Sequence, residues 1–517
     1  MFTGERYVLP LNGSFNGNDD LTDIPAGQFA TGTRNGNTHN GGLEKRGGTA
    51  VVGSQISAGL TSLGGGQLVK RSSSTQHLYF AANDGALYRD GVSIVSSRST
   101  SAYNHLTPID DKMFIANGVD AVKVDTGSAV ATISGPSADW TGATQPKKII
   151  VHTKGGSRRT FAWGVPGREN YLYYSSTGAF ETFTGGTSGN VFVDMRHGEG
   201  IINCVSKDGT LWIFGKEETF YLDDSDATVA NWGTVRASFR GGVHSPRLSC
   251  VANNFIFNMT TEGDIYEVQT AEQLRDFEQA SIVEPFFIHS YIKANWDLTK
   301  INQFHMEYEP KTKSVRVFGV RIGQSVADEC LVYYVNQTKW GPVHDGTDNA
   351  STNGTGYKAA ASFFASASDG TKRLYTQDYN GRTWELESST KSDNGNAYTS
   401  VGITPWLDFD LEGVEKRYPY ATLSYKSLGD YDLDILWSVD GVNQTSATVS
   451  LAANGAVLDS FLLDTDALSV VGISEQEFDL GNVGRKIRLQ ISNDGAGEDF
   501  FLSQVIFHFL VRGGRRQ

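Results

Sequence analysis

Acidic residues are the first candidates for chemistry in this chain, because several follow in close succession: Glu217, Glu218, Asp223, Asp224 and Asp226. Glycoside hydrolysis uses two carboxyl groups on either side of the scissile bond, or in some enzymes a tyrosine nucleophile supported by arginines. The residues here lie at the end of an expected strand and in the turn after it, where a solvated acidic loop is the simpler interpretation. Catalysis stays open at this point, because the sequence does not show which carboxyl groups converge in space.

The segment Ser206–Trp212 (SKDGTLW) places a serine, an aspartate, a glycine and a tryptophan around one turn. It is similar to the Asp box of sialidase propellers, S-x-D-x-G-x-T-W, although its aspartate-to-threonine spacing is shorter and Leu211 precedes the tryptophan. The segment Ser368–Thr371 begins in the same way but continues without a tryptophan. An Asp box is a structural turn in which the aspartate accepts backbone N–H groups, so the segment indicates a hairpin rather than an active site.

Aromatic residues gather at Tyr171–Tyr174, followed by Phe180 and Phe183. Such rings can stack on sugars, but residues that alternate along a strand place every second side chain in the core. We therefore predict that this cluster is half core and half surface.

Patterns for metals, phosphate groups and activated nucleophiles are poorly represented. The ten histidines are scattered, and Asp408-x-Asp410-x-Glu412 begins like a calcium-binding loop but lacks the glutamate at the twelfth position and lies within an expected strand. The chain contains neither a G-x-x-x-x-G-K-[ST] phosphate loop nor a G-x-S-x-G nucleophile elbow. We therefore expect no metal, no cofactor and no catalytic residue, and the chain is predicted not to be an enzyme.

The composition is acidic, with a formal net charge of -14 and a pI of about 5.2. A protein that coats nucleic acid needs a basic face, so we expect DNA at most to pass by without specific binding. Cys204, Cys250 and Cys330 stand in apolar surroundings and are expected to be buried and reduced. The sequence has no signal-peptide pattern and no stretch of about 18 apolar residues, so we expect synthesis in a cytoplasm and no membrane span.

Short strand–turn–strand units recur along most of the chain and must position any site. Apolar residues alternate on both sides of a turn that carries glycine, as in Gln76–Arg89, Asp111–Val124, Ile202–Tyr221, Asn254–Val268 and Leu374–Glu385. The alternation predicts strands, and the Asp-Gly and Asn-Gly pairs predict tight hairpins. About seven units at a spacing of roughly 50 residues are typical of propeller blades. The sequence therefore predicts an all-β fold with a β-propeller of about seven blades.

Three regions are expected along the chain. Residues 1–48 are rich in glycine and asparagine and are predicted to form an extended N-terminal arm, followed by a β-propeller-like domain at 49–397. Residues 398–517 contain seven expected strands at the spacing of a C-terminal β-sandwich domain. Two tracts interrupt the hairpins: Ala271–Gln279, which is predicted to be a short helix, and Ala350–Tyr357, which is predicted to be a polar loop.

Further runs of residues share the order of a known family. They are Gly42–Gly48 (GLEKRGG), Asn170–Ser175 followed by Gly200–Ile202 and Leu211–Phe214, and Leu407–Asp410 followed by the ending Gly513–Arg515. On these runs the chain resembles the tail-nozzle, or head-to-tail (packaged DNA stabilisation), proteins of short-tailed bacteriophages. It departs from their G-L-x-K-R-P-G signature in having Gly47 where proline is usual.

The resemblance implies a structural virion protein of the phage tail, made in the cytoplasm of a bacterial host. Six copies would form a ring-shaped nozzle below the portal and adaptor ring, retain the packaged DNA and form a conduit for genome ejection. Tailspikes or fibres are further expected partners. Lys45 and Arg46 are the residues predicted to contact a neighbouring chain.

Two alternatives from other classes remain. One is a glycan-binding or sialidase-like propeller, which repeated full Asp boxes and an arginine triad would favour. The other is a different phage tail or baseplate component that binds a host receptor.

Overall fold

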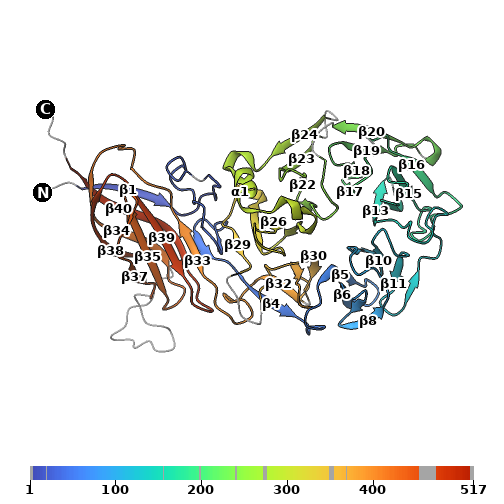
Figure 1. Cartoon of the computed structure of the whole chain (residues 1–517), viewed down its shortest axis with the longest axis horizontal. Helices are drawn as coiled ribbons and strands as arrows, with labels where there is room; N and C mark the ends of the chain where they lie inside the picture. Colours follow the sequence, from blue (N-terminus) through green and yellow to red (C-terminus); the bar gives the residue numbers. More distant parts are fainter. Residues whose placement is uncertain are drawn as a thin grey trace.

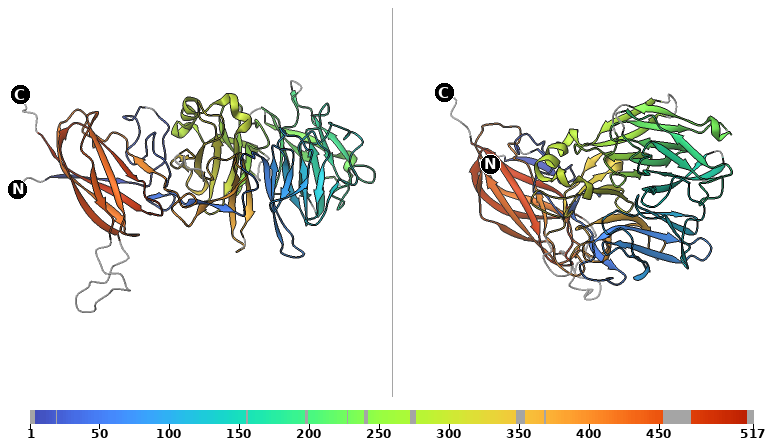
Figure 2. Two further views of the ribbon diagram at one scale, coloured as in Figure 1. Left: turned by 60° about the horizontal axis from the view of Figure 1, so that its bottom comes forward. Right: turned by 45° about the vertical axis from the view of Figure 1, so that its right-hand side comes forward.

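The structure is a computed structural model that describes residues 4–512 except residues 19, 155, 197–198, 227, 239–241, 272–275, 348–353, 368 and 453–472. Two units lie next to each other along the longest axis of the molecule (Figure 1). The larger unit is a circle of small sheets, and the smaller unit holds long strands from both ends of the chain (Figure 2).

Seven antiparallel sheets of the described residues follow one another around the larger unit. The first sheet contains β5 (Ser62–Val69), β6 (Gln76–Ala82), β7 (Leu87–Arg89) and β8 (Val92–Val95). The second contains β9 (His105–Ile109), β10 (Lys112–Ala116), β11 (Lys123–Asp125) and β12 (Val130–Thr132). The third contains β13 (Lys148–Lys154), β14 (Ser157–Trp163), β15 (Tyr171–Tyr174) and β16 (Gly189–Phe192). The fourth sheet contains β17 (Asn203–Lys207), β18 (Thr210–Phe214), β19 (Thr219–Asp223) and β20 (Gly233–Ser238). The fifth contains β21 (Ser249–Ala252), β22 (Phe255–Met259), β23 (Ile265–Ala271) and β24 (Asp276–Ser281). The sixth contains β25 (His305–Glu309), β26 (Ser314–Gly319), β27 (Glu329–Tyr334) and β28 (Lys339–Trp340), with β29 (His344–Asp345) also paired to β27.

The seventh sheet closes the circle with a strand from the other end of the unit. It consists of β30 (Ala361–Ser366), β31 (Lys372–Gln377), β32 (Thr383–Ser388) and β4 (Gly48–Val52). Val52 pairs with Thr383 and Val51 with Trp384. Because β4 precedes the first sheet in sequence, this pairing joins the last blade to the first, and the larger unit is a β-propeller.

The tight hairpin predicted at Asp208 and Gly209 is confirmed in this unit, whereas the pair Asn117–Gly118 lies in a longer connection between β10 and β11. Asp208 and Gly209 join β17 to β18 with φ values of 49° and 72°, the left-handed conformation that a two-residue hairpin needs at both positions. Neighbouring sheets then bury the apolar faces that single hairpins leave open. Phe161 of β14, for example, packs in one core with Leu211 and Ile213 of β18.

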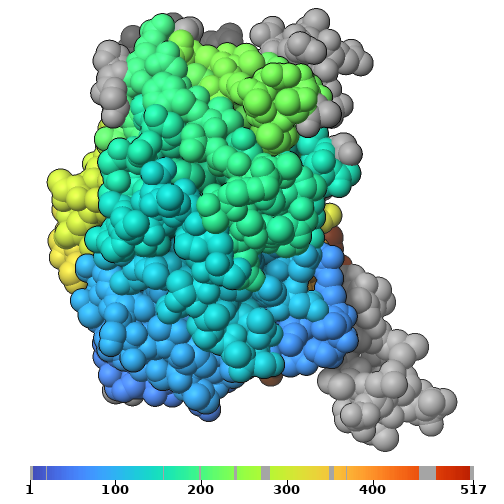
Figure 3. Space-filling view, turned by 90° about the vertical axis from the view of Figure 1, so that its right-hand side faces the viewer, coloured from blue at the N-terminus to red at the C-terminus, as the bar shows by residue number. Residues whose placement is uncertain are grey.

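The first strand of each sheet lies at the centre of the propeller. The strand β9 packs against β5 and β13, and β30 packs against β25 and β5. In the side view of Figure 3, the segments coloured blue, cyan and green form a continuous surface. The central strands therefore have one edge that faces the axis and not another strand of their own sheet.

The smaller unit consists of two antiparallel sheets that share one hydrophobic core. One sheet contains β1 (Glu5–Pro10), β2 (Gly36–Asn37), β3 (Leu43–Lys45), β34 (Lys416–Lys426), β38 (Ile473–Gly484) and β40 (Phe501–Val511). The other contains β33 (Ser400–Ile403), β35 (Asp432–Val439), β36 (Val442–Asn443), β37 (Ala447–Ser450) and β39 (Ile487–Asn493).

The prediction of an extended N-terminal arm is wrong for the described part of residues 1–48. The strand β1 pairs along its whole length with β40, and Leu9, Leu11 and Leu43 lie in the core of the smaller unit. Each of these leucines is at most 1% exposed. Hydrophobic burial within the same chain therefore fixes the segment that was expected to reach a neighbour.

The predicted helix at Ala271–Gln279 is also wrong where the structure describes it, because Ala271 ends β23 and Asp276 begins β24. The α-helix of the described chain is instead α1 (Ile288–Asn295), and short 3-10 helices lie at Val229–Asn231, Glu284–Phe286, Leu298–Gln303 and Val335–Gln337. The run from Asp408 to Asp410 is a turn and not a strand, with φ values of 56° and 59° at Phe409 and Asp410. Ser368, most of the loop at Ala350–Tyr357 and the ending Gly513–Arg515 lie outside the described residues.

None of the described helices is long and apolar enough to cross a membrane. The three cysteines are buried and free, as predicted.

Candidate binding site in the central channel

A polar pocket of about 150 Å³, the channel pocket, lies among the innermost strands of the propeller. It is lined by residues at or near the first positions of several central strands: Gly65, Tyr103, Asn104, His105, Leu106, Lys148, Pro246, Arg247, Ser249, His305, Met306, Glu307, Ser362 and Phe363. Strands β5, β9, β13, β21, β25 and β30 all contribute. The pocket thus exists only when the circle of sheets is closed.

Lys148 and Glu307 are the two oppositely charged groups of the pocket. Burial lowers the pKa of Lys148 to about 8, and Glu307 partly offsets that effect. Burial raises the pKa of Glu307 to about 7. Near neutral pH the lysine is mostly charged while the carboxyl group is only partly ionised, so positive charge prevails between these two groups.

The two histidines of the pocket act as neutral polar groups. Burial holds the pKa of His105 and that of His305 well below the usual value. His305 Nδ1 lies 2.8 Å from Ser362 Oγ, and its Nε2 lies 3.0 Å from the Ala359 carbonyl oxygen, so Nε2 carries the proton. The histidines therefore add hydrogen-bonding capacity without adding charge.

Arg247 supplies the second permanent cation. Its guanidinium lies 4.2 Å from the centre of the Tyr103 ring, and it donates to the backbone oxygens of Asn302 and Ala360. Its Nε and the Ser249 hydroxyl are buried and have no hydrogen-bond partner among the described residues. Unpaired buried donors are costly unless a ligand or water satisfies them, which marks this side of the pocket as a place for an acceptor group.

The lining of the pocket suits a small polar ligand with a negative charge. Arg247 and Lys148 can pair with a carboxylate, and the Tyr103 ring offers an apolar face. Among the described residues that line the pocket, Glu307 is the one carboxyl group. This lining therefore lacks the second carboxyl group that glycoside hydrolysis by a pair of carboxyl groups requires.

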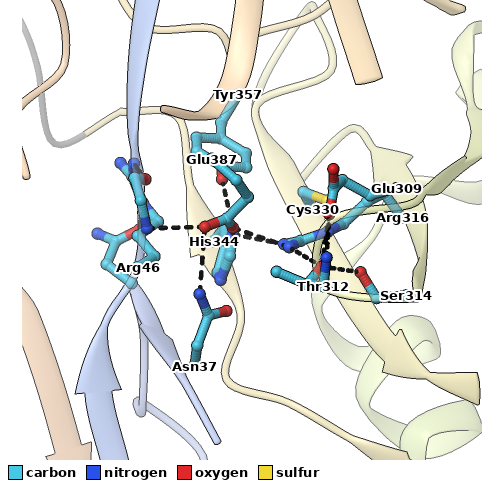
Figure 4. Close-up of polar contacts among 12 residues, drawn as sticks. Asn37, Arg46, Glu309, Thr312, Ser314, Arg316, Cys330, His344, Tyr357 and Glu387 are labelled. Carbon is cyan, nitrogen blue, oxygen red and sulfur yellow. Dashed lines mark hydrogen bonds and ion pairs between the residues drawn. The ribbon is translucent and has the colours of Figure 1, made fainter. Parts of the chain in front are cut away.

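Lys45 and Arg46, the residues predicted from the sequence, lie instead at the end of β3 and directly after it, before β4 begins, at the junction of the two units. Figure 4 shows Arg46 there. Lys45 Nζ donates to Asn493 Oδ1 and to the Gly495 carbonyl, each at 2.7 Å. Burial lowers the pKa of Lys45 to about 8. Its side chain thus ties the end of β3 to the chain after β39.

Arg46 is 0% exposed and fully paired inside the chain. Its Nη1 and Nη2 donate to the two carboxylate oxygens of Asp393 at 2.9 Å and 2.7 Å, and its Nε donates to Asn35 Oδ1 at 3.0 Å. The guanidinium also lies 3.7 Å from the centre of the Tyr398 ring. The residue is therefore not on the surface where a contact with another chain was expected.

Glu387 is the acidic centre of the same junction. It accepts hydrogen bonds from Arg316 Nη2 at 2.8 Å, from the Gly47 N–H at 2.7 Å and from Asn37 Nδ2 at 3.2 Å (Figure 4). Burial alone would raise the pKa of Glu387, but Arg316 and these donors outweigh it and hold the pKa well below its usual range. The cluster links the N-terminal segment to the last two sheets of the propeller.

The acidic run of the sequence is only partly the solvated loop that was predicted. Asp223 and Asp226 accept local turn hydrogen bonds at the surface. Glu218 and Asp224 are 7% and 8% exposed. Glu218 pairs with Arg196 and Arg236, and Asp224 pairs with His152 and Lys154. These partners lie far away in sequence, so no local signal could have revealed them.

The other sequence candidates fall in cores and turns. Leu172, Tyr173, Tyr174 and Phe183 are at most 5% exposed, so most of the predicted aromatic surface is buried. Trp212 belongs to a hydrophobic core, and Asp208 and Gly209 form the turn that the Asp-box pattern indicated. Among the described residues, no group of three or more His, Cys, Asp and Glu side chains could hold a metal ion.

No known protein family matches the chain by sequence. The curated proteins likewise contain no match.

Solved structures with similar folds share little sequence with it. The WD40 domain of Neurospora crassa Pan2 covers 67% of this chain and 98% of its own length, with 10% identity and a TM-score of 0.37. YCF48 bound to a D1 peptide covers 66% and 98%, with 11% identity and a TM-score of 0.41. AFV00434, an ancestral GH74 enzyme, covers 74% and 53%, with 10% identity and a TM-score of 0.40.

The prediction that the chain is not an enzyme is corrected by this comparison. The prediction assumed that a turn-rich propeller without recognisable catalytic motifs has a structural role. A glycoside hydrolase stands among the similar structures, so the fold gives no ground for excluding catalysis.

Proposed function

We propose that this chain is a glycan-binding protein, a seven-bladed propeller joined to a β-sandwich, and that it binds an acidic saccharide in the channel pocket. The observation that carries the proposal is the convergence of Arg247, Lys148 and Tyr103 in one pocket. A carboxylate on a sugar would pair with the two cations, and the pyranose ring would lie against the tyrosine.

The size of the pocket limits what it can hold. Pockets for drug-sized ligands usually measure about 300–1,000 Å³, and this one measures about 150 Å³. It therefore suits the terminal residue of a glycan, while the remainder of the chain extends into solvent. Uronic acids and sialic acids have the required chemistry, because each places a carboxylate on a pyranose ring.

The test is titration calorimetry with the complete protein and two monosaccharide pairs, glucuronate against glucose and N-acetylneuraminate against N-acetylmannosamine. We expect binding of at least one acid and a weakening of about tenfold or more in Lys148→Met, because a charge-assisted hydrogen bond contributes about 1.5–3 kcal/mol. Lys293→Met is the matched control, since Lys293 is an exposed lysine of α1. Equal binding of acidic and neutral sugars, or an unchanged affinity of Lys148→Met, would contradict the proposal.

A second candidate function is a structural part of a short-tailed phage tail. The junction around Arg46 and Glu387 favours it, because a part that carries load needs its units fixed rigidly to each other. In this proposal six copies form a ring below the portal and adaptor, DNA passes through without specific binding, and tailspikes or fibres attach outside. Mass photometry of the protein with candidate adaptor rings distinguishes the two functions, since a glycan-binding monomer would ignore those rings.

A further inference from the structure

Three side chains from two neighbouring sheets form a hydrogen-bonded series of serine, histidine and aspartate. His152 lies near the end of β13, Ser206 lies near the end of β17, and Asp224 directly follows β19. His152 Nδ1 is 2.8 Å from Ser206 Oγ, and His152 Nε2 is 3.1 Å from Asp224 Oδ2. The imidazole thus joins a hydroxyl on one side to a carboxylate on the other.

The exposure of the three residues differs in a useful way. His152 and Asp224 are buried at 3% and 8% exposure, whereas Ser206 is partly exposed. Ser206 lies one residue before the end of β17, and the exposed turn residues Asp208 and Gly209 follow. Ser206 is therefore the member of the series with the most contact with solvent, while the histidine and the aspartate are buried.

The carboxylate is held in its ionised form. Lys154 Nζ lies 2.7 Å from Asp224 Oδ1, the oxygen that does not face the histidine. Burial would raise the pKa of Asp224, but the hydrogen bonds from His152 and Lys154 outweigh it and lower that pKa. An ionised aspartate fixes the tautomer of the imidazole, with the proton on Nε2 and the lone pair of Nδ1 toward the serine.

The backbone places an N–H group beside the same hydroxyl. Lys207 and Thr210 flank the two-residue turn and pair with each other, so they exchange the ladder hydrogen bonds. The next pair, Ser206 and Leu211, is then a pair without these bonds, and the Ser206 N–H points away from β18. Among the described strands of this sheet, β17 has β18 as its one neighbour, so that N–H lies at the open edge toward the axis.

We propose that Ser206, His152 and Asp224 form a triad that hydrolyses small esters, with Ser206 as nucleophile, His152 as general base and Asp224 as the group that orients the imidazole. The site is separate from the channel pocket. His152 lies four residues beyond Lys148 on β13, about 13 Å along the strand. It therefore does not depend on the proposed binding of saccharides.

The reaction is an acyl transfer in two steps. Ser206 Oγ attacks the ester carbonyl carbon while its proton moves to His152 Nδ1, and the Ser206 N–H donates to the oxyanion. The C–O bond to the alcohol then breaks, and His152 gives its proton to the leaving oxygen. In the second step His152 takes a proton from water, the hydroxide attacks the acyl carbon, and the carboxylic acid leaves as Ser206 recovers its proton.

The imidazole of His152 has the opposite orientation to that in serine proteases, in which Nε2 faces the serine and Nδ1 faces the aspartate. Both ring nitrogens can accept or donate a proton, so the direction of transfer is unchanged. The chain itself supplies a comparison. Ser362 Oγ also lies 2.8 Å from a histidine Nδ1, that of His305, but His305 Nε2 faces the Ala359 carbonyl and not a carboxylate.

The experiment is labelling of the complete folded protein with a fluorophosphonate probe, followed by mass spectrometry of the modified peptide, together with p-nitrophenyl acetate hydrolysis. We expect a covalent adduct at Ser206, loss of the adduct in Ser206→Ala, and a labelling rate at least about 100-fold lower in Asp224→Asn. Ser93→Ala, at an exposed serine of β8, is the matched control and should label as the unchanged protein does.

A purely structural bridge between the two sheets gives different results. The folded protein would then carry no adduct at Ser206, or its labelling rate would be the same in Asp224→Asn. Either result overturns the proposal. Circular dichroism of each variant establishes that the comparison is made between folded proteins, and Ser206→Ala removes only one oxygen atom.

Discussion

Replacement of Arg46 by leucine is the sharpest test of how the two units hold together. The substitution leaves Asp393, which is 1% exposed, without its two guanidinium donors at 2.9 Å and 2.7 Å. It also removes the stacking on Tyr398. Removal of one partner from a buried ion pair typically costs about 3–5 kcal/mol.

The size of this loss can be compared with the stability of a whole domain. Domains unfold at a cost of about 5–15 kcal/mol, so Arg46→Leu should remove about a fifth or more of the total. Arg46→Lys keeps the charge but cannot form the paired hydrogen bonds, and we expect an intermediate loss. In the double variant Arg46→Leu with Asp393→Leu, no charge is left unpaired, so part of the stability should return.

The assay is urea unfolding followed by tryptophan fluorescence, because the fully buried Trp384 lies in β32 at the closure of the propeller. Arg417→Leu is the matched control, since Arg417 is an exposed arginine of β34 and should change stability by no more than about 0.5 kcal/mol. If Arg46→Leu unfolds at the same urea concentration as Arg417→Leu, the junction does not hold the units together in the way argued here.

Three further outcomes are expected. The depressed pKa of Glu387 gives stability that is present above about pH 4.3, the unfolded value, and is lost as pH falls below it; acid titration of Glu387→Gln should lack this part of the transition. Binding of an acidic saccharide should weaken between pH 7 and 9 as Lys148, with a pKa of about 8, loses its proton, and calorimetry of Lys148→Met across that range should show a smaller loss, which comes from the ionisation of Glu307. Gly48→Ala should destabilise the fold by about 1–3 kcal/mol because its Cβ would meet the Ser392 carbonyl oxygen at 2.0 Å. Gly233→Ala, whose Cβ meets nothing within 4 Å, should stay within about 0.5 kcal/mol in the same thermal unfolding assay.

Local patterns in the sequence predicted the local structure well. The Asp-Gly pair at Asp208 and Gly209 predicted a hairpin, and its two positive φ values are the physical reason for that residue choice. Alternating apolar residues predicted strands because the period of a strand is two residues. These signals act over a few residues, so they predict local structure without knowledge of the fold.

Pairings between distant segments could not be predicted in the same way. The glycine- and asparagine-rich start of the chain indicated an arm, yet Leu9 pairs with Val505 and lies in a core built mostly from the last third of the chain. The channel pocket was missed for a related reason. Lys148 and Glu307 are ordinary surface residues by local pattern, and they meet only because separate strands converge at the axis.

Arg46 shows how a residue singled out from the sequence can have a different structural role from the one expected. The run around it stood out in the sequence because it resembles the G-L-x-K-R-P-G signature of the tail-nozzle proteins. In the structure the glycines of this run admit close backbone contacts, since a Cβ at Gly47 would meet Glu387 at 2.6 Å. The run is therefore distinctive because it builds a crowded, charged interior, and not because it is presented to a partner.

The path of the N-terminal segment explains why the junction matters for both units. Within one short stretch, β3 pairs with β40 in the smaller unit and β4 pairs with β32 in the propeller, and Arg46 and Gly47 lie between them. The same stretch thus completes a sheet on each side. Because opening either sheet would strain the paired and buried residues between them, the two units should unfold together and not one after the other. A single urea transition, seen both by Trp384 in the propeller and by Trp437 in β35, is the result that this connection requires.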